Sequence, residues 1–148
     1  MRKIILPPIL LVFCIAGIYL TGHMEGATFW HSGNWNYLGY GVLLLGLLLP
    51  VWGARVFKQH ETNILPYKDP DSIVTDGPFK FTRNPMYLGM LLVTVAANIL
   101  VATPSGLLFS ALYFAVANWW YIPYEEGRMQ EIFGDTFEDY KGSVRRWV

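Results

Sequence analysis

Arg83 and the acidic pair Glu125-Glu126 flank a long uncharged part of the chain, because residues 84–124 contain no Asp, Glu, Lys or Arg. The sequence Thr-Pro-Ser-Gly at 103–106 falls near the middle of this run and favours a tight turn. Each arm has ~20 residues, which is the length that crosses a bilayer as a helix. The hairpin returns Arg83 and both glutamates to one membrane face, where a polar ligand could meet an acceptor dissolved in lipid. The arrangement predicts an enzyme that works at the membrane interface.

The composition is that of an integral-membrane protein. Of the 148 residues, 53% are hydrophobic and 15% are charged, and the mean hydropathy is +0.32, values that are high for a soluble domain. The chain is therefore expected to be one all-α domain, residues 1–148, folded as an integral-membrane helical bundle. The formal net charge is zero, which gives no basic field for nucleic acid. Cys14 is the only cysteine and the histidines match no metal-binding spacing, so neither a disulfide nor a metal site is predicted.

Four membrane-spanning helices are expected to position the charged residues. Their approximate bounds are 4–22, 37–56, 85–102 and 106–122, with a loop at 57–84 and a tail at 123–148. Pro7 and Pro8 fall in the first turn of the first span, where a missing N–H is tolerated. A secretory signal peptide is the competing interpretation of this segment. The long apolar run without a small-residue cleavage site favours a retained anchor.

The basic residues predict the orientation in the membrane. With four spans and a cytoplasmic N-terminus, all 11 Lys and Arg residues fall on the cytoplasmic side. The two outer connections, about 22–36 and 102–105, contain none. Because cytoplasmic loops of membrane proteins are enriched in Lys and Arg, both termini and the predicted site are expected in the cytoplasm.

The tail is predicted to form an amphipathic helix that is interrupted at Gly134. Apolar residues recur every three or four positions, and acidic residues lie between them, as on a helix with one apolar face. The apolar set consists of Met129, Ile132, Phe133, Phe137, Tyr140, Val144 and Trp147. Such a helix could lie on the membrane surface or fold over the active face as a lid, and the sequence leaves both arrangements open.

Two segments of the chain resemble the signatures of one superfamily of membrane enzymes. The first runs from Ser72 to Gly89 and reads SIVTDGPFKFTRNPMYLG. The second comprises Glu125-Glu126, then Ile132-Phe-Gly134, Tyr140 and Val144-Arg145. In this order, and separated by a membrane hairpin, they resemble the isoprenylcysteine carboxyl methyltransferase and phospholipid methyltransferase superfamily. The resemblance covers about residues 71–147 and implies methyl transfer from S-adenosylmethionine to an acceptor taken from the bilayer.

The resemblance also implies roles for individual residues. S-Adenosylmethionine presents an ammonium, a carboxylate, ribose hydroxyls and an adenine ring, so its site needs an acidic acceptor, hydrogen-bond donors and apolar walls. Contacts with this cofactor are predicted at Asp71, Ser72, Ile73, Val74, Phe79, Asn84, Pro85, Met86, Tyr87 and Glu125. Catalytic roles are predicted for Arg83 and Glu126, and acceptor binding for Tyr121 and Arg145. Methyl transfer is an in-line displacement that depends on alignment and exclusion of water, so no covalent nucleophile is required.

The class of acceptor is less closely defined by the residues. Isoprenylcysteine enzymes typically have Arg-His-Pro where this chain has Arg83-Asn84-Pro85, and an arginine one turn before the glutamates where residues 119–121 are aromatic. The expected acceptor is a lipophilic or prenylated carboxylate held by Arg83, Arg145 or Arg146. A phospholipid amine, which must lose a proton before it attacks, is the alternative. A contrasting hypothesis is a small non-catalytic membrane protein whose charged residues only anchor helices at the interface.

Overall fold

Every regular element that the structure describes is a helix. The structure is a computed structural model and describes residues 6–26, 33–60 and 72–148. Its elements are α1 (Pro7–Glu25), α2 (Gly33–Gln59), the 3-10 helix η1 (Gly77–Lys80), α3 (Pro85–Val101), α4 (Leu107–Val116), the π-helical turn η2 (Ala117–Tyr121), α5 (Ile122–Phe133) and α6 (Asp135–Ser143). The predicted all-α class is confirmed.

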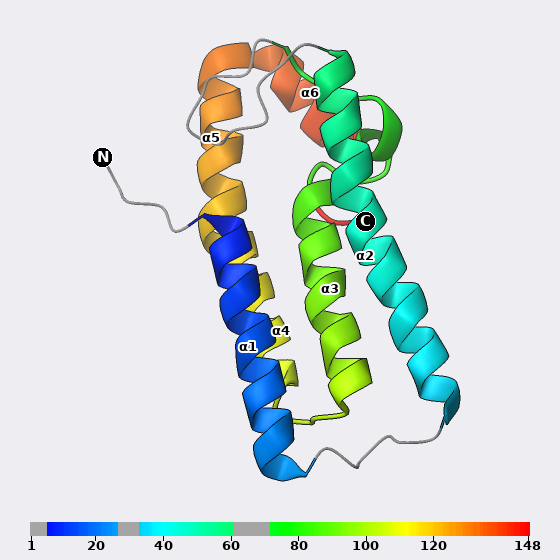
Figure 1. Ribbon diagram of the computed structural model, residues 1–148. Helices are drawn as coiled ribbons and strands as arrows, with labels where there is room; N and C mark the ends of the chain where they lie inside the picture. The colour runs from blue at the N-terminus through cyan, green and yellow to red at the C-terminus, as the bar shows by residue number, and fades with distance from the viewer. Residues whose placement is uncertain (1–5, 27–32, 61–71) are drawn as a thin grey trace.

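The long helices lie side by side (Figure 1). α4, η2 and α5 follow one another without interruption and form one rod beside α1, whereas α3 lies against α2. The C-terminal end of α1, the N-terminal end of α2 and the turn between α3 and α4 lie at one end of the molecule. α6 lies across the opposite end, beside the C-terminal turns of α2 and the end of α5.

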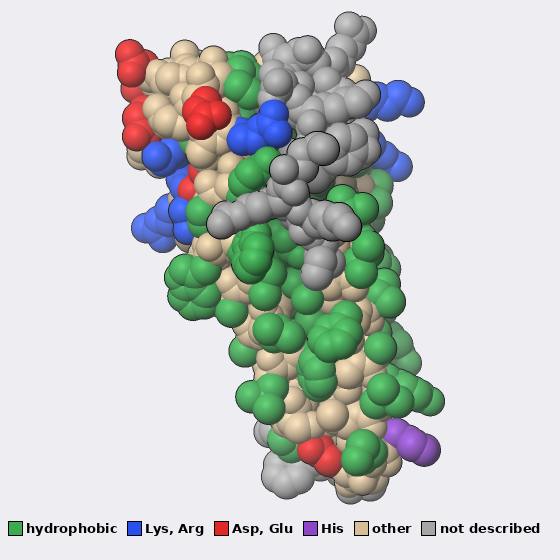
Figure 2. All heavy atoms as spheres, turned by 90° about the vertical axis from the view of Figure 1, so that its left-hand side faces the viewer, with side chains coloured by type: hydrophobic (Ala, Val, Ile, Leu, Met, Phe, Trp, Pro, Cys, Tyr) green, Lys and Arg blue, Asp and Glu red, His purple; other side chains and the backbone are tan. Residues whose placement is uncertain are grey.

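α1 and α2 are each long and apolar enough to cross a membrane, with 19 and 27 residues. Only 22% and 17% of the residues in their most apolar 18-residue stretches are buried inside the molecule. The core helices of a soluble fold are mostly buried. Figure 2 shows apolar side chains over the middle and lower part of one face, while Lys, Arg, Asp and Glu gather mainly at the upper end. This distribution fits a helical membrane protein. The segments predicted at 85–102 and 106–122 are helical, as α3 and as α4 with η2, but α3 is shorter than the two candidate spans.

Two glycines allow the close contact between α2 and α3, which is the most extensive helix contact in the fold. A Cβ atom on Gly46 would lie 2.9 Å from the Gly89 carbonyl oxygen, and one on Gly89 would lie 2.7 Å from the Gly46 carbonyl oxygen. The Gly89 Cβ would also collide with the ring of Pro50, which lies within α2. Small residues that let backbones approach are a common means of packing helices in membranes. The contact fixes the start of α3 against the C-terminal half of α2.

The turn between α3 and α4 is held from both sides. The Asn98 side-chain amide donates to Ser110 Oγ at 2.6 Å and to the Gly106 carbonyl oxygen at 3.0 Å. Glu25, at the end of α1, accepts a hydrogen bond from Thr103 Oγ1 at 2.7 Å. The turn predicted at residues 103–106 is confirmed, and it returns the chain to the end of the molecule where α3 begins.

The tail bends at Gly134, as the sequence predicts. Gly134 has a φ of 52°, a conformation that favours glycine, and it separates α5 from α6. α6 buries Phe137 and Tyr140 against a cluster from α2, η1 and the segment before η1. Acidic residues on its other face, such as Glu138 and Asp139, are exposed. α6 is therefore packed against the body of the fold.

Candidate functional site

A cavity with a volume of ≈ 420 Å³ lies where the start of α1, the end of α2, η1, the start of α3, α5 and α6 meet. This volume falls within the range of ~300–1,000 Å³ that is typical of small-molecule sites. Its wall is mostly apolar, with Phe57, Met90, Met129 and Phe137 among the contributing residues. Polar groups enter it from α5 and from the turn before α3. A mostly apolar cavity with a few convergent polar groups is the usual form of a binding site.

The cavity brings together both segments that the sequence analysis selects. The lining residues among the predicted site are Ser72, Val74, Phe79, Arg83, Asn84, Pro85, Met86, Tyr87, Glu125 and Glu126. The first eight come from the segment before and at the start of α3, and the two glutamates come from α5. The hairpin between them therefore places the two segments side by side around one space.

The local sequence explains why the turn before α3 reaches the cavity. Gly77 has a φ of 59°, and a Cβ atom there would lie 2.8 Å from Val56 Cγ2, so glycine lets η1 approach α2. Pro85 opens α3, at a position where a backbone N–H is not needed. The Asn84 N–H donates to Thr82 Oγ1 at 3.1 Å. These features fix the turn from which residues 84–87 line the cavity.

Glu125 forms no ion pair within residues 6–26, 33–60 and 72–148. Its Oε1 accepts a hydrogen bond from the Tyr87 hydroxyl at 2.7 Å, and the Tyr121 ring stacks on Tyr87 with ring centroids 6.0 Å apart. Burial raises the pKa of Glu125 to about 7; the Tyr87 hydrogen bond opposes this effect and the Glu126 carboxylate adds to it. Near neutral pH, Glu125 is therefore partly protonated, and a cationic ligand would stabilise its ionised form.

Glu126 lies beside Glu125 in the chain but has two basic partners. Its Oε1 accepts from Arg83 Nη2 at 2.8 Å and its Oε2 from Arg146 Nη2 at 2.5 Å. Burial raises the pKa of Glu126, but the hydrogen bonds and charges of Arg146 and Arg83 outweigh burial and lower the pKa overall. The two adjacent glutamates therefore differ in charge state, and Glu126 stays ionised at neutral pH.

Arg83 is bound mainly by the last turn of α6 and by the segment that follows it. Its backbone N–H donates to the Arg145 carbonyl oxygen at 3.0 Å. Its Nη1 donates to the carbonyl oxygens of Val144 and Lys141. Among the described residues, its buried Nε has no hydrogen-bond partner. Most of the hydrogen-bonding capacity of this guanidinium is thus used within the protein.

Three of the predicted residues that the structure describes do not line the cavity. Tyr121 lies behind Tyr87 and is only 5% exposed. Ile73 packs against the cluster that α6 covers, and the Arg145 side chain is exposed. Asp71 lies outside the described residues. The described part of the chain also contains no group of three His, Cys, Asp or Glu side chains placed to hold a metal ion.

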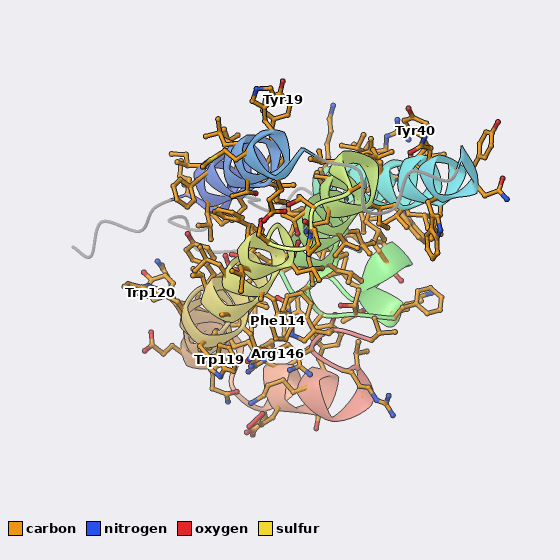
Figure 3. The ribbon with its side chains drawn as sticks, turned by 90° about the horizontal axis from the view of Figure 1, so that it is seen from below. Tyr19, Tyr40, Phe114, Trp119, Trp120 and Arg146 are labelled. Atoms are coloured by element: carbon orange, nitrogen blue, oxygen red, sulfur yellow. The ribbon has the colours of Figure 1, made fainter. Side chains whose placement is uncertain are left out.

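Arg146 and Tyr140 contact the site although the sequence points to them only weakly. The Tyr140 hydroxyl donates to the Phe79 carbonyl oxygen at 2.8 Å, and burial raises the pKa of Tyr140 to about 12. In Figure 3, Arg146 lies beneath the α4 rod near Phe114, whereas Trp120 points away from the bundle. The sequence marks Tyr140 as part of an apolar stripe and of the second signature, without a role in the site, and Arg146 only as one of three cations that could hold a carboxylate.

The fold is consistent with a helical membrane protein, its cavity with acidic side chains is a candidate small-molecule site, and sequence comparison identifies the family. The profile of the phospholipid methyltransferase family matches residues 35–136. The chain therefore belongs to this family, and the predicted resemblance is confirmed.

Several relatives are protein-S-isoprenylcysteine O-methyltransferases. The chain is 33% identical over 112 residues to protein-S-isoprenylcysteine O-methyltransferase B of Arabidopsis thaliana, an alignment that covers 72% of this chain and 55% of that protein. It is 33% identical over 86 residues to enzyme A of the same plant, covering 55% of this chain and 42% of that protein. It is 24% identical over 115 residues to a probable protein-S-isoprenylcysteine O-methyltransferase of Oryza sativa subsp. japonica, covering 74% and 58%. The chain spans about half the length of the curated relatives it matches.

Proposed function

We propose that this chain is an integral-membrane methyltransferase that transfers a methyl group from S-adenosylmethionine to a lipophilic acceptor, of the isoprenylcysteine carboxylate type. One observation carries the proposal. Both family signatures line one cavity, and within the described residues the Glu125 carboxylate in it has no Lys or Arg partner. The names of the relatives support the acceptor class.

The residues of the cavity fit S-adenosylmethionine. The cofactor is cationic at its sulfonium and ammonium groups, and Glu125 offers a carboxylate whose ionised form a cation would stabilise. Phe79 and Met86 offer an aromatic and a polarisable surface for the adenine ring. We assign cofactor contacts to Glu125 and to residues 84–87, which line the same cavity.

When bound, S-adenosylmethionine supplies an electrophilic methyl group on sulfur, which becomes a neutral thioether after transfer. The chain contributes alignment and exclusion of water. Tyr87 holds the Glu125 carboxylate, and Tyr121 stacks behind Tyr87, so the acid that orients the cation is itself fixed. Apolar side chains such as Met90 and Met129 keep water from the reacting groups and provide a surface for a lipophilic acceptor.

We further propose four membrane spans, formed by α1, α2, α3 and α4 with η2, with the cavity on the cytoplasmic side. All Lys and Arg residues of the described chain lie at 55–58, 80–83 and 128–146, which supports this orientation. In a Cys14→Ser background, single cysteines at Gly33 and Ser105 should react with a membrane-impermeant thiol reagent added to intact cells. Cysteines at Ser72 and Ser143 should not. Labelling of position 72 from outside would overturn the orientation.

A phospholipid amine is the second candidate acceptor. The observation that favours it is that two arginines near the cavity are already paired with a glutamate. Arg83 and Arg146 both bind Glu126, so neither offers its full charge to a carboxylate acceptor. An amine must instead lose a proton to become nucleophilic. Glu125, with a pKa of about 7, is suited to accept that proton.

Two experiments test the proposal. Calorimetric titration of the purified protein with S-adenosylhomocysteine tests the cofactor site, and absence of binding would support the non-catalytic hypothesis. Incubation with methyl-labelled S-adenosylmethionine, a prenylcysteine analogue and phosphatidylethanolamine tests the acceptor. Base-labile label in the prenylcysteine indicates a methyl ester, and base-stable label in the lipid indicates an N-methyl group. Label confined to a water-soluble small molecule would contradict a lipophilic acceptor.

A further inference from the structure

The segment after α6, residues 144–147, pairs with the turn that precedes α3. Thr82 Oγ1 and Asn84 Nδ2 both donate to the Arg146 carbonyl oxygen, at 3.2 Å and 3.0 Å. The Arg83 backbone N–H donates to the Arg145 carbonyl oxygen at 3.0 Å. Three successive residues of the turn thus bind the backbone of this segment, although more than 60 residues separate the two in sequence.

The same segment is attached to the α4–α5 rod by its side chains. The Arg146 guanidinium binds Glu126 in α5, and its Nη1 donates to the Asn118 carbonyl oxygen in η2 at 3.4 Å. Trp147 Nε1 donates to Asn118 Oδ1 at 3.0 Å. The Trp147 ring lies 5.2 Å from the ring of Phe114 in α4, centroid to centroid. Figure 3 shows Arg146 on this side of the rod.

Residues 144–147 therefore connect two walls of the cavity, in addition to the direct bonds of Tyr87 with Glu125 and of Arg83 with Glu126. One wall is the turn at 82–84, which leads into residues 84–87. The other is α5, which carries Glu125 next to Glu126. The distance between these walls sets the width of the space in which a ligand would touch both, so the connecting segment helps to set the geometry of the site.

We propose that residues 144–147 form a strap that positions the cavity walls for cofactor binding, and that Arg83, Glu126 and Arg146 are positioning residues that hold the strap. The inference rests on the proposed function, because it assigns a part of that cofactor site. Both oxygens of Glu126 bind guanidinium groups, and an ionised, doubly paired carboxylate is a poor proton acceptor. Glu125, which has only the Tyr87 hydroxyl among these contacts, is the acid that faces the ligand.

Loss of the strap should weaken cofactor binding without stopping the chemistry. Arg146→Met removes one partner of Glu126 and leaves Arg83 as the remaining ion pair between the turn at 82–84 and α5, so the turn is held less firmly. We expect the affinity for S-adenosylhomocysteine to fall about tenfold, as for the loss of a charge-assisted hydrogen bond. Methyl transfer at saturating cofactor should stay within about threefold of wild type, since no reacting group is lost. Arg146→Lys, which keeps one charge, should restore part of the affinity.

Arg145→Met is the matched control for cofactor affinity, because Arg145 is a neighbouring arginine whose side chain is exposed. Its affinity for S-adenosylhomocysteine should equal that of wild type, since the strap uses only its carbonyl group. Glu126→Gln should weaken binding at least as much as Arg146→Met does, because Glu126 also pairs with Arg83. The double variant should bind S-adenosylhomocysteine no more weakly than the weaker-binding single variant does, because both changes break the same connection between Arg146 and Glu126.

Three results would overturn the strap. The first is equal affinity of Arg146→Met and Arg145→Met for S-adenosylhomocysteine. The second is a Glu126→Gln protein that loses turnover at saturating cofactor while Arg146→Met keeps it, since Glu126 would then be a reacting group. If Arg146→Met does not fold, Trp147→Phe is the substitute variant, because it removes only the hydrogen bond to Asn118. The third result is an affinity of Trp147→Phe for S-adenosylhomocysteine equal to that of wild type. If the wild-type protein itself does not bind S-adenosylhomocysteine, the proposed function is contradicted. The three results above, in contrast, are obtained with a wild-type protein that binds.

Discussion

Titration of Glu125 should control the affinity of the protein for a cationic ligand. Glu125→Gln removes the charge but keeps an oxygen that accepts the Tyr87 hydroxyl. With a pKa of about 7, the ionised fraction of Glu125 rises from about one tenth at about pH 6 to about nine tenths at about pH 8. If the cofactor's ammonium binds the ionised form, S-adenosylhomocysteine should bind roughly tenfold more tightly at the higher pH. Glu125→Gln should bind more weakly at the higher pH and lose this dependence.

The same pKa predicts that the stability of the folded protein falls as the pH rises, whereas the affinity for the ligand increases. Burial raises the pKa of Glu125 from 4.5 to about 7, so between these values the folded protein holds a proton that the unfolded chain releases. The stabilisation is complete below about pH 4.5 and is lost as the pH rises through about 7. It amounts to at most about 3 kcal/mol, and Glu125→Gln should not show it.

Calorimetry at several pH values measures the affinity, and thermal unfolding in detergent at the same values measures the stability. All other titratable groups are common to wild type and variant, so the difference between the two profiles isolates Glu125. Parallel profiles of wild type and Glu125→Gln, in either measurement, would refute the assignment of a raised pKa to this residue.

Three further predictions concern packing and the site. Gly89→Leu should lower the free energy of unfolding by about 3 kcal/mol, because the new side chain collides with α2. Gly142→Leu, where a Cβ meets no atom within 4 Å, is the control, and equal thermal midpoints would contradict the prediction. Asn98→Leu should cost about 1–3 kcal/mol, since it removes buried bonds to the hairpin turn; chemical unfolding that matches wild type would show that these bonds contribute nothing. Tyr87→Phe removes the hydrogen bond that lowers the pKa of Glu125, so the pH midpoint of S-adenosylhomocysteine binding should move up, and a downward shift would contradict this interpretation.

The sequence predicts the fold class and the meeting of the two signatures because both follow from local patterns. Uncharged runs of membrane-spanning length and the turn at 103–106 are readable without any tertiary contact. Once the hairpin forms, its two ends must lie together, so Arg83 and the glutamates are brought to the same region. The proline and glycine residues around η1 and α3 also act through local backbone geometry.

The partners of the two glutamates could not be predicted in this way. After Ser143 the chain becomes extended, with Val144 at φ −128° and ψ 134°, and successive side chains of an extended segment point in opposite directions. Which of Arg145 and Arg146 faces Glu126 therefore depends on where α6 ends. That end is set by packing of α6 against a cluster distant in sequence. The contrast between Glu125 and Glu126 follows from this tertiary contact.

The π-helical turn η2, residues 117–121, sets the direction in which the acidic pair points. A π turn accommodates an additional residue compared with an α turn, and one residue corresponds to about 100° of rotation about a helix axis. Deletion of one residue from this turn would rotate Glu125 and Glu126 by about a quarter of the circumference, away from Tyr87 and Arg83, with both signatures intact. In homologous chains, the number of residues between the hairpin turn and the acidic pair therefore determines whether the glutamates can contact the residues equivalent to Tyr87 and Arg83.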